Sequence, residues 1–421
     1  MTNGDRTMNR GGFVKFAAAG GLAIATPLAT AQRARAGTSI AVKVGVLVPT
    51  GSSYASMGRS LVDGLTLGFD DERTGSSAVN PAFAQRDVER GYDGASAAAT
   101  ELLDGGADVV VAGVSALVAD RLGALFAERQ ASLVVADVGA HVVQPAAQNK
   151  NVLHNSLLLW QSSFAAGQWA AATVGKSAFL AATVGDAGYD ALFAFRRGFE
   201  SGGGTIVGDA VTGAGATSPS LAEVMAAIRA SGASVVYGLY SGARAAEFVQ
   251  AYAGSGVGAT LVTGSLAVED FLLSSIGSAA AGATSCASWT STRSTRANQA
   301  FTKAFKTRYG RSADPFAALG YDTAALVAEG ARRATKHGLG LRRLIEALEG
   351  VSLDGPRGTL VVDATTNTVT GPLWMRQVKR TVNGLANVDV AQAPNVTPFP
   401  GALSPLTADP RSGYLNEYLC A

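Results

Sequence analysis

The chain has 421 residues, of which 48% are hydrophobic and 16% charged, and its formal net charge is +2. This length exceeds one ordinary core and favours two globular domains. No face combines clustered Lys and Arg with interleaved aromatic residues, which argues against a nucleic-acid partner. The two cysteines, Cys286 and Cys420, lie outside any metal-binding spacing, so we expect neither a metal site nor a cofactor.

Residues 1–36 have the layout of a secretory signal peptide. A basic start is followed by an uncharged, mostly apolar run over 16–31, and small-x-small sites end at Ala31 and Ala36. We expect cleavage after Ala36 and a periplasmic or secreted protein. Residues 9–15 resemble a twin-arginine export motif in which Gly11 stands where the second arginine belongs, so general secretion stays open. In an oxidising compartment Cys286 and Cys420 could form a disulfide or remain two thiols.

After the signal segment, apolar β-branched runs alternate with helical segments. The expected strands are 40–48, 109–111, 133–135, 179–184, 235–239 and 260–263, and the expected helices are 59–69, 94–103, 116–129, 189–201, 220–231 and 243–253. This alternation predicts an α/β fold with parallel sheets covered by helices on both faces. The pattern occurs twice, separated by an extended crossing segment at 152–160, which favours two Rossmann-like lobes. Three further helices, at 297–309, 321–336 and 341–348, precede a β-rich tail that starts at Thr359.

The motifs of common enzyme classes are missing from the sequence. It has three histidines and no G-x-S-x-G elbow, HExxH pair or Walker loop. Residues 254–259 match a G-x-G-x-x-A string, but they follow a helix and precede a strand. A dinucleotide-binding fingerprint requires the reverse order. We therefore expect a binding protein and no catalytic residues.

A series of short segments gives the chain a family resemblance. The segments are 42–49 with Gly51, Tyr54 and Gly58; 102–113; 181–199; 298–301 with Tyr309 and Gly310; and 320–322. In this order they resemble the type I periplasmic binding proteins, and most closely the branch that binds branched-chain amino acids for ABC transporters. The resemblance covers nearly all of residues 40–380.

The resemblance implies two lobes that a three-strand hinge joins and that close over a ligand at the carboxyl ends of their strands. Lobe 1 would comprise 37–155 plus 290–365, and lobe 2 would comprise 156–289 plus 366–421. The implied function is an extracytoplasmic solute-binding protein that captures an amino acid, carboxylate or amide and delivers it to an ABC permease. The alternative is a sensing module of the same fold that reports to a signalling partner. We expect a monomer.

The resemblance also implies ligand-binding residues in lobe 1. Ser53 and Tyr54 would follow the first strand, where helix-start amides favour an anionic group. Ser115 would hold a ligand carboxylate, cap its own helix, or do both. Ala140 and His141 end the next strand, where the family has a small residue and Thr or Ser. An imidazole there could bond a ligand oxygen and would change its charge near about pH 6.5.

In lobe 2, the resemblance implies that Tyr189 stacks over the ligand and that Tyr240 makes a second contact. Ser265 lies where the amino acid binders carry an acid that pairs with the ligand ammonium. Residues 263–266 contain no acid, and Glu269 is three residues further on. Because a buried ammonium needs a partner, a carboxylate without an amine, an amide or another neutral polar compound fits as well as an amino acid.

Overall fold

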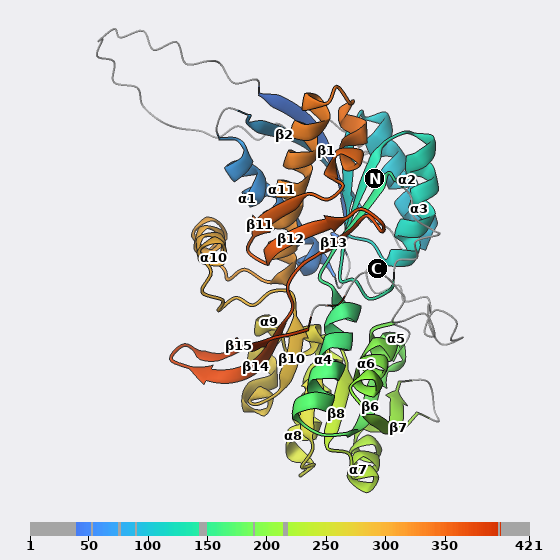
Figure 1. The fold of residues 1–421 in the computed structure, drawn as a ribbon, viewed down its shortest axis with the longest axis vertical. Coiled ribbons are helices and arrows are strands. Elements are labelled where there is room, and N and C mark those ends of the chain that lie inside the picture. The colour runs from blue at the N-terminus through green and yellow to red at the C-terminus, as the bar shows by residue number, and fades with distance from the viewer. Residues whose placement is uncertain are drawn as a thin grey trace, which may run out of the picture.

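The structure, a computed structural model, describes residues 39–51, 54–74, 77–88, 91–142, 150–187, 190–213, 218–394 and 396. The expected signal peptide lies outside these residues. Figure 1 shows two lobes stacked along the long axis of the molecule. No helix within the described ranges is both long and apolar enough to cross a membrane.

Lobe 1 is built on an eight-stranded sheet of order β11-β12-β13-β5-β4-β3-β1-β2. Its strands are β1 (Ile40–Val48), β2 (Val79–Asp87), β3 (Val109–Ala112), β4 (Ser132–Asp137), β5 (Val152–Ser156), β11 (Ser352–Gly355), β12 (Gly358–Asp363) and β13 (Thr368–Thr370). Strands β1 to β5 are parallel, whereas β11, β12 and β13 pair antiparallel with one another. The apolar strands β3 and β4 are buried throughout because helices cover both faces of the sheet.

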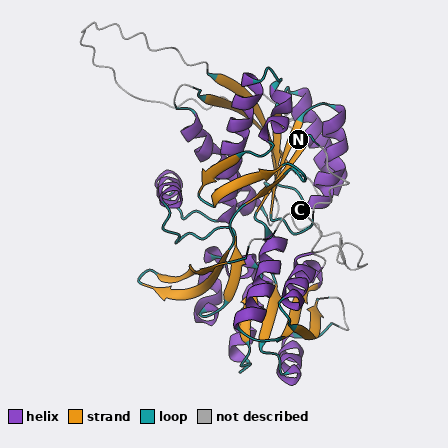
Figure 2. Cartoon of the chain, viewed as in Figure 1, coloured by secondary structure: helices purple, strands orange, loops and turns teal. Residues whose placement is uncertain are grey.

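Helices α1 and α11 cover one face of this sheet, and α2 and α3 cover the other. The helices of lobe 1 are α1 (Ala55–Glu72), α2 (Gly91–Asp104), α3 (Ala116–Glu128), α10 (Arg296–Tyr309), α11 (Pro315–Lys336) and the 3-10 helix η4 (Leu341–Leu348). Figure 2 shows this layering in both lobes.

Lobe 2 is built on a seven-stranded sheet of order β15-β14-β10-β9-β8-β6-β7. Its strands are β6 (Ser177–Thr183), β7 (Thr205–Thr212), β8 (Val235–Leu239), β9 (Thr260–Thr263), β10 (Thr284–Ala287), β14 (Trp374–Thr381) and β15 (Gly384–Gln392). Its helices are α4 (Leu159–Thr173), α5 (Val184–Ala187), α6 (Asp190–Ser201), α7 (Leu221–Ser231), α8 (Gly242–Gly254), α9 (Asp270–Ile276), η2 (Ser265–Val268) and η3 (Gly277–Ala280). Strands β6 to β10 are parallel, and β14 and β15 form an antiparallel hairpin.

The chain passes three times between the two sheets, at 157–158, 288–295 and 371–373. The hydroxyl of Ser288 donates a hydrogen bond to the Leu157 carbonyl at 3.1 Å, which ties two of these crossings together. Strand β13 pairs with β12 and β5, so the chain leaves the first sheet after Thr370, a few residues beyond the boundary expected at 365.

Two expected elements differ in the structure. The extended segment expected over 152–160 is wrong in its second half, because β5 ends at Ser156 and α4 begins at Leu159. Helix α4 is buried nearly all round its first three turns, so its sequence shows no polar face. The helix expected over 341–348 is a 3-10 helix.

Candidate functional site

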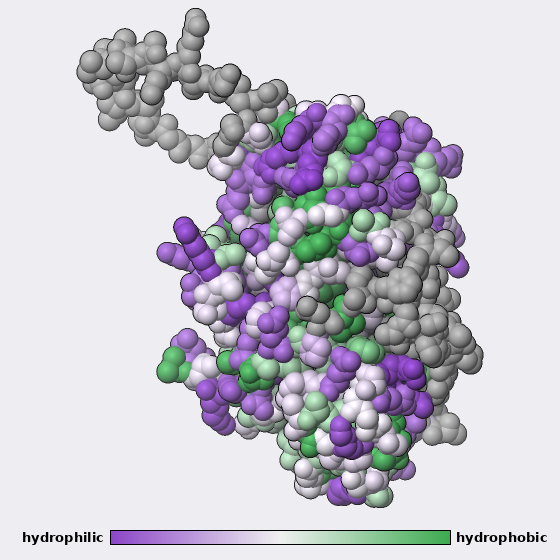
Figure 3. All heavy atoms as spheres, viewed as in Figure 1, coloured by the Kyte–Doolittle hydropathy of each residue, from purple (hydrophilic) through white to green (hydrophobic). Residues whose placement is uncertain are grey.

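Chain segments that leave parallel strands of both sheets form the candidate site. In lobe 1 these segments follow β1, β3 and β4, and in lobe 2 they follow β6, β8 and β9. Ligands of open parallel sheets bind beyond the carboxyl ends of the strands. In Figure 3, the upper end of the molecule is mostly hydrophilic, and hydrophobic residues appear in the middle and over the lower lobe.

Tyr54 lies at the end of the loop that leaves β1. It is half-buried, and its carbonyl accepts hydrogen bonds from the amides of Met57 and Gly58 at 2.9 and 3.1 Å, which starts α1. A Cβ at Gly58 would overlap the Pro49 carbonyl oxygen, so only glycine lets α1 begin this close to β1. Ser53, the other residue expected here, lies outside the described residues.

Ser115 is the N-cap residue of α3. Its hydroxyl oxygen accepts a hydrogen bond from the Val118 amide at 3.4 Å, and its side chain is buried. A serine hydroxyl can accept and donate at once, so this cap geometry is compatible with a bond donated to a ligand. Of the two roles expected for Ser115, the structure therefore contains the cap.

The segment after β4 runs from buried to partly exposed residues. The Asp137 carboxylate is buried and accepts a hydrogen bond from the Gly139 amide at 3.0 Å. Burial raises the pKa of Asp137 to about 7, and the nearby His141 opposes this rise. Ala140 is buried in the core, whereas the His141 side chain is 15% exposed. The Nδ1 atom of His141 lies 3.6 Å from a carboxylate oxygen of Asp190, which belongs to lobe 2.

A pocket of about 390 Å³ lies at the carboxyl ends of β6, β7 and β8 in lobe 2. The Asp186 carboxylate lines this pocket and accepts hydrogen bonds from the hydroxyls of Thr183, at 2.6 Å, and Ser241, at 2.9 Å. Burial raises the pKa of Asp186 to about 6, and the two hydroxyls oppose this rise.

Tyr240 lines the same pocket. Its ring stacks on Phe248 with 4.2 Å between the ring centroids, and only 3% of the residue is exposed. Its hydroxyl lies 3.5 Å from the hydroxyl of Thr212, and burial raises its pKa to about 12. Tyr240 therefore presents a small part of its surface to the pocket. Tyr189 lies outside the described residues.

Ser265 begins the 3-10 helix η2 and is buried. Its carbonyl oxygen accepts a hydrogen bond from Nη2 of Arg376 at 2.6 Å. The same guanidinium nitrogen lies 2.5 Å from a Glu269 carboxylate oxygen, and both side chains are 3% exposed or less. Burial raises the pKa of Glu269, and Arg376 opposes this rise. Glu269, the first acid after residues 263–266 in the sequence, therefore forms a buried ion pair with Arg376, which the sequence analysis did not predict.

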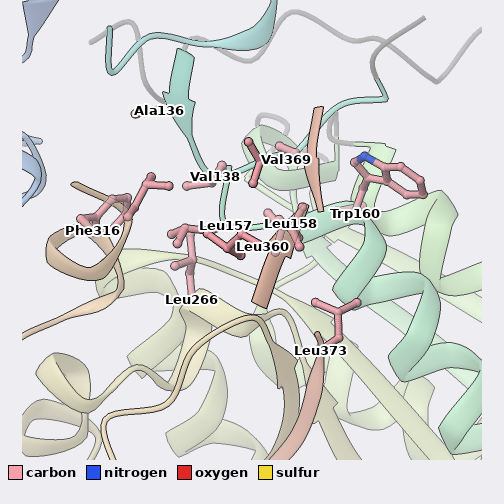
Figure 4. Packing of buried hydrophobic residues seen from close by; sticks show 14 of the residues in the cluster. Ala136, Val138, Leu157, Leu158, Trp160, Leu266, Phe316, Leu360, Val369 and Leu373 are labelled. Atoms are coloured by element: carbon pink, nitrogen blue, oxygen red, sulfur yellow. The ribbon is translucent and has the colours of Figure 1, made fainter. Parts of the chain in front are cut away.

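Apolar side chains from both lobes meet beside these residues. Leu266 of lobe 2 lies next to Leu157, and Val138 and Phe316 of lobe 1 belong to the same buried cluster (Figure 4). These side chains therefore form a buried apolar contact between the two lobes.

Cys286 is a buried free thiol whose pKa burial raises to about 12, and Cys420 lies outside the described residues, so their pairing stays a prediction. In the part of the chain that the structure describes, no group of three or more His, Cys, Asp or Glu side chains could hold a metal ion.

Comparisons with known proteins agree with this geometry. A family model described as "Periplasmic binding protein" matches residues 41–384. No curated protein matches the chain. Among solved structures, an ABC transporter substrate-binding protein from Sphaerobacter thermophilus is 22% identical with a TM-score of 0.77, covering 85% of this chain and 99% of that one.

Two further solved structures are similar in fold. A solute-binding protein of an ABC transporter from R. palustris, in complex with benzoate, is 24% identical with a TM-score of 0.70 and covers 85% of this chain and 99% of that one. The branched-chain amino acid transporter substrate binding protein LivJ from Streptococcus pneumoniae, in complex with isoleucine, is 16% identical with a TM-score of 0.67 and covers 83% of this chain and 100% of that one. The two-lobed α/β fold and the solute-binding role expected from the sequence are confirmed, and the chain belongs to the periplasmic binding protein family.

Proposed function

We propose that this chain delivers a small carboxylate with an apolar or aromatic body, and without an amine, to an ABC permease. The observation that carries the proposal is the ion pair between Glu269 and Arg376. Glu269 is the first acid after the expected ammonium position in the sequence, and this pair already neutralises its charge. Three further carboxylates around the site also receive hydrogen bonds, Asp137 from Gly139, Asp186 from Thr183 and Ser241, and Asp190 from Val142. A ligand ammonium would thus compete for carboxylates that are already engaged, at a cost of desolvation.

The apolar surroundings of the site support the same ligand class. Leu266, Phe316 and Val138 form a buried apolar cluster where the lobes meet, which favours an aliphatic or aromatic body beside it. The start of α3 with its cap Ser115 supplies amides and a hydroxyl for the carboxylate, because helix N-termini attract anions. Solved structures of similar fold contain benzoate, 4-hydroxybenzoate or 3,4-dihydroxybenzoic acid.

The proposed role also implies the ligand contacts, the lobe closure and the export of the protein. Ligand contacts come from Ser53, Tyr54, Ser115, Ala140 and His141 in lobe 1 and from Tyr189, Tyr240 and Ser265 in lobe 2. Hinge closure traps the ligand, and the protein does no chemistry on it. Residues 1–36 serve as the export signal, and the exported protein acts as a monomer.

Matched ligand pairs test the proposal on residues 37–421. Each pair differs only by the α-ammonium: 3-phenylpropanoate against phenylalanine, and 4-methylpentanoate against leucine. We expect the compound without the amine to bind about 100-fold more tightly, because an ammonium without a dedicated partner costs a few kcal/mol on burial. Isothermal titration calorimetry measures both affinities. Equal or tighter binding of either amino acid would contradict the proposal.

Ser115→Ala tests the carboxylate subsite. We expect at least about a tenfold loss of affinity for 3-phenylpropanoate, because a hydrogen bond to a charged group contributes about 1.5–3 kcal/mol. Ser275→Ala, on the exposed surface of α9, is the matched control and should bind like the unaltered protein. The melting temperatures of both ligand-free variants show whether the loss comes from binding or from the lost helix cap.

A further inference from the structure

A groove beside the second crossing (288–295) separates α10 of lobe 1 from the β14–β15 hairpin of lobe 2 (Figure 1). This α10 groove has a volume of about 990 Å³. Its lobe 1 wall is formed by α10 and the segment that leads to α11, and its lobe 2 wall by the start of α9 and the hairpin. None of the described residues assigned above to the ligand lines it, so the groove is a separate feature of the surface.

Both walls of the α10 groove are tied to the second crossing. In lobe 1, the indole N–H of Trp289 donates a hydrogen bond to the Asn298 side chain of α10 at 2.7 Å. In lobe 2, the Thr292 hydroxyl donates to the Asn387 carbonyl of β15, also at 2.7 Å. A partner therefore meets a surface that is formed before it binds, which lowers the entropy cost of binding.

The lobe 1 wall is strongly basic. Residues 271–313 contain no Asp or Glu and six Lys or Arg residues, which are Arg293, Arg296, Lys303, Lys306, Arg308 and Arg311. Arg308 and Arg311 pair with Asp70 and Asp63, whereas Lys303 and Lys306 form no ion pair with the described residues. Both lysines are exposed and line the groove. They lie three residues apart on one helix, where like charges repel each other, so an acidic partner would relieve this repulsion.

The acids that line the α10 groove already have partners. Asp270 accepts a hydrogen bond from the Ser291 hydroxyl and Asp314 accepts one from the Ser60 hydroxyl, each at 2.5 Å. Glu269 is held in the buried ion pair described above. The positive charge of the two lysines is therefore not neutralised by the acids of the groove, and the groove complements a negatively charged partner.

The lobe 2 wall adds apolar surface to the groove. Phe271, the second residue of α9, is 52% exposed, and Leu385 of β15 is half-buried beside the hairpin turn. An apolar side chain placed against Phe271 would remove apolar area from water and stabilise the complex. The groove therefore fits a chain that carries both acidic and apolar side chains.

We propose that the α10 groove docks an acidic polypeptide segment, whose carboxylates contact Lys303 and Lys306 and whose apolar side chain covers Phe271. The ABC permease of the proposed function supplies this segment, so the inference rests on that function for the identity of the partner. A recess between two walls admits a chain segment, whereas a flat membrane surface would meet only its rims. Because the walls belong to different lobes, the bound segment contacts both lobes at once.

Fluorescence anisotropy with two labelled peptides tests the groove on residues 37–421. The acidic probe is Glu-Glu-Phe-Glu-Glu and the neutral probe is Gln-Gln-Phe-Gln-Gln, both with blocked ends. We expect the acidic probe to bind at least about tenfold more tightly, and added salt to weaken its binding selectively, because exposed charges are screened. Equal binding of the two probes, or no binding of the acidic probe, would overturn the proposal.

Charge reversal in the groove locates the binding. Lys303→Glu combined with Lys306→Glu is expected to weaken binding of the acidic probe at least about tenfold, and Phe271→Ser about threefold. The matched control, Arg121→Glu combined with Lys336→Glu, makes the same change of net charge at exposed positions outside the groove. It should bind the probe within about twofold of the unaltered protein. An equal loss in this control would show that net charge alone attracts the probe and would also overturn the proposal.

Two further measurements separate this proposal from its alternatives. Vesicles of equal parts phosphatidylglycerol and phosphatidylcholine that bind through the two lysines, while the acidic probe does not bind, would replace the polypeptide partner by a membrane surface. Titration of 3-phenylpropanoate into the charge-reversed groove variant should give the affinity of the unaltered protein. If the unaltered protein binds 3-phenylpropanoate but not the acidic probe, the docking proposal fails and the proposed function stands. Binding of the probe without 3-phenylpropanoate would support the groove and contradict the proposed ligand.

Discussion

Replacing Arg376 with alanine is expected to lower the free energy of unfolding by about 3–5 kcal/mol, because it leaves a buried carboxylate without its counter-charge. The Arg376 guanidinium lies 2.5 Å from Glu269, and it donates to the Ser265 carbonyl at 2.6 Å, the Ser285 hydroxyl at 2.9 Å and the Trp289 carbonyl at 3.3 Å. Only 1% of its side chain is exposed, so water does not replace these bonds. The midpoint of urea unfolding measures the loss.

Two comparisons make this prediction specific to the buried pair. Arg244→Ala breaks the Arg244–Glu247 pair, whose arginine side chain is 72% exposed, and should cost less than about 1 kcal/mol. The double variant Arg376→Met with Glu269→Gln removes both charges and should recover part of the loss. A midpoint for Arg376→Ala that equals that of Arg244→Ala would contradict the prediction.

A second buried arginine has the equivalent role in lobe 1. Arg357 donates hydrogen bonds to Asp322 at 2.5 Å, to the Ser156 carbonyl at 2.6 Å and to the Asn155 side chain at 2.6 Å. Ser156 ends β5, directly before the first crossing, and Arg376 lies in β14, directly after the third. Each arginine thus joins buried polar groups of one lobe directly beside the segments that cross between the lobes.

The sequence predicts six strands of the parallel sheets, β1, β3, β4, β6, β8 and β9, because most of their residues are buried and apolar. Strands such as β3 and β4 are unbroken apolar runs, and helices follow them at the expected spacing. Strand β2 escapes the same analysis because it is an edge strand that contains Pro81 and has largely polar, partly exposed residues. Helix α4 was not predicted because it is buried nearly all round, so its sequence lacks the alternation of apolar and polar residues that marks a helix with one exposed face.

Some residues of the candidate site could be predicted from the sequence, and others could not. Residues such as Ser115 and His141 could be selected from sequence because they directly follow predicted strands. The partner of Glu269 could not, because Arg376 is 107 residues away in the sequence and no local pattern links the two. The contact of Asp190 with His141 and Val142 could not be predicted either, because it depends on how the two lobes are placed relative to each other.

Close helix packing in both lobes leads to the second large effect. A Cβ at Gly198 of α6 would overlap the Phe164 carbonyl oxygen of α4, and a Cβ at Gly320 of α11 would overlap the Leu61 carbonyl oxygen of α1. Backbone atoms cannot rotate away as a side chain can, so the helices must separate and the core around them must open. We expect Gly198→Ala and Gly320→Ala each to lower the free energy of unfolding by about 3 kcal/mol.

Gly254→Ala, at the exposed end of α8, is the matched control because nothing lies within 4 Å of the added Cβ, and it should be neutral or stabilising by up to about 1 kcal/mol. Urea unfolding measures all three variants. A midpoint for Gly198→Ala or Gly320→Ala equal to that of Gly254→Ala would contradict the prediction.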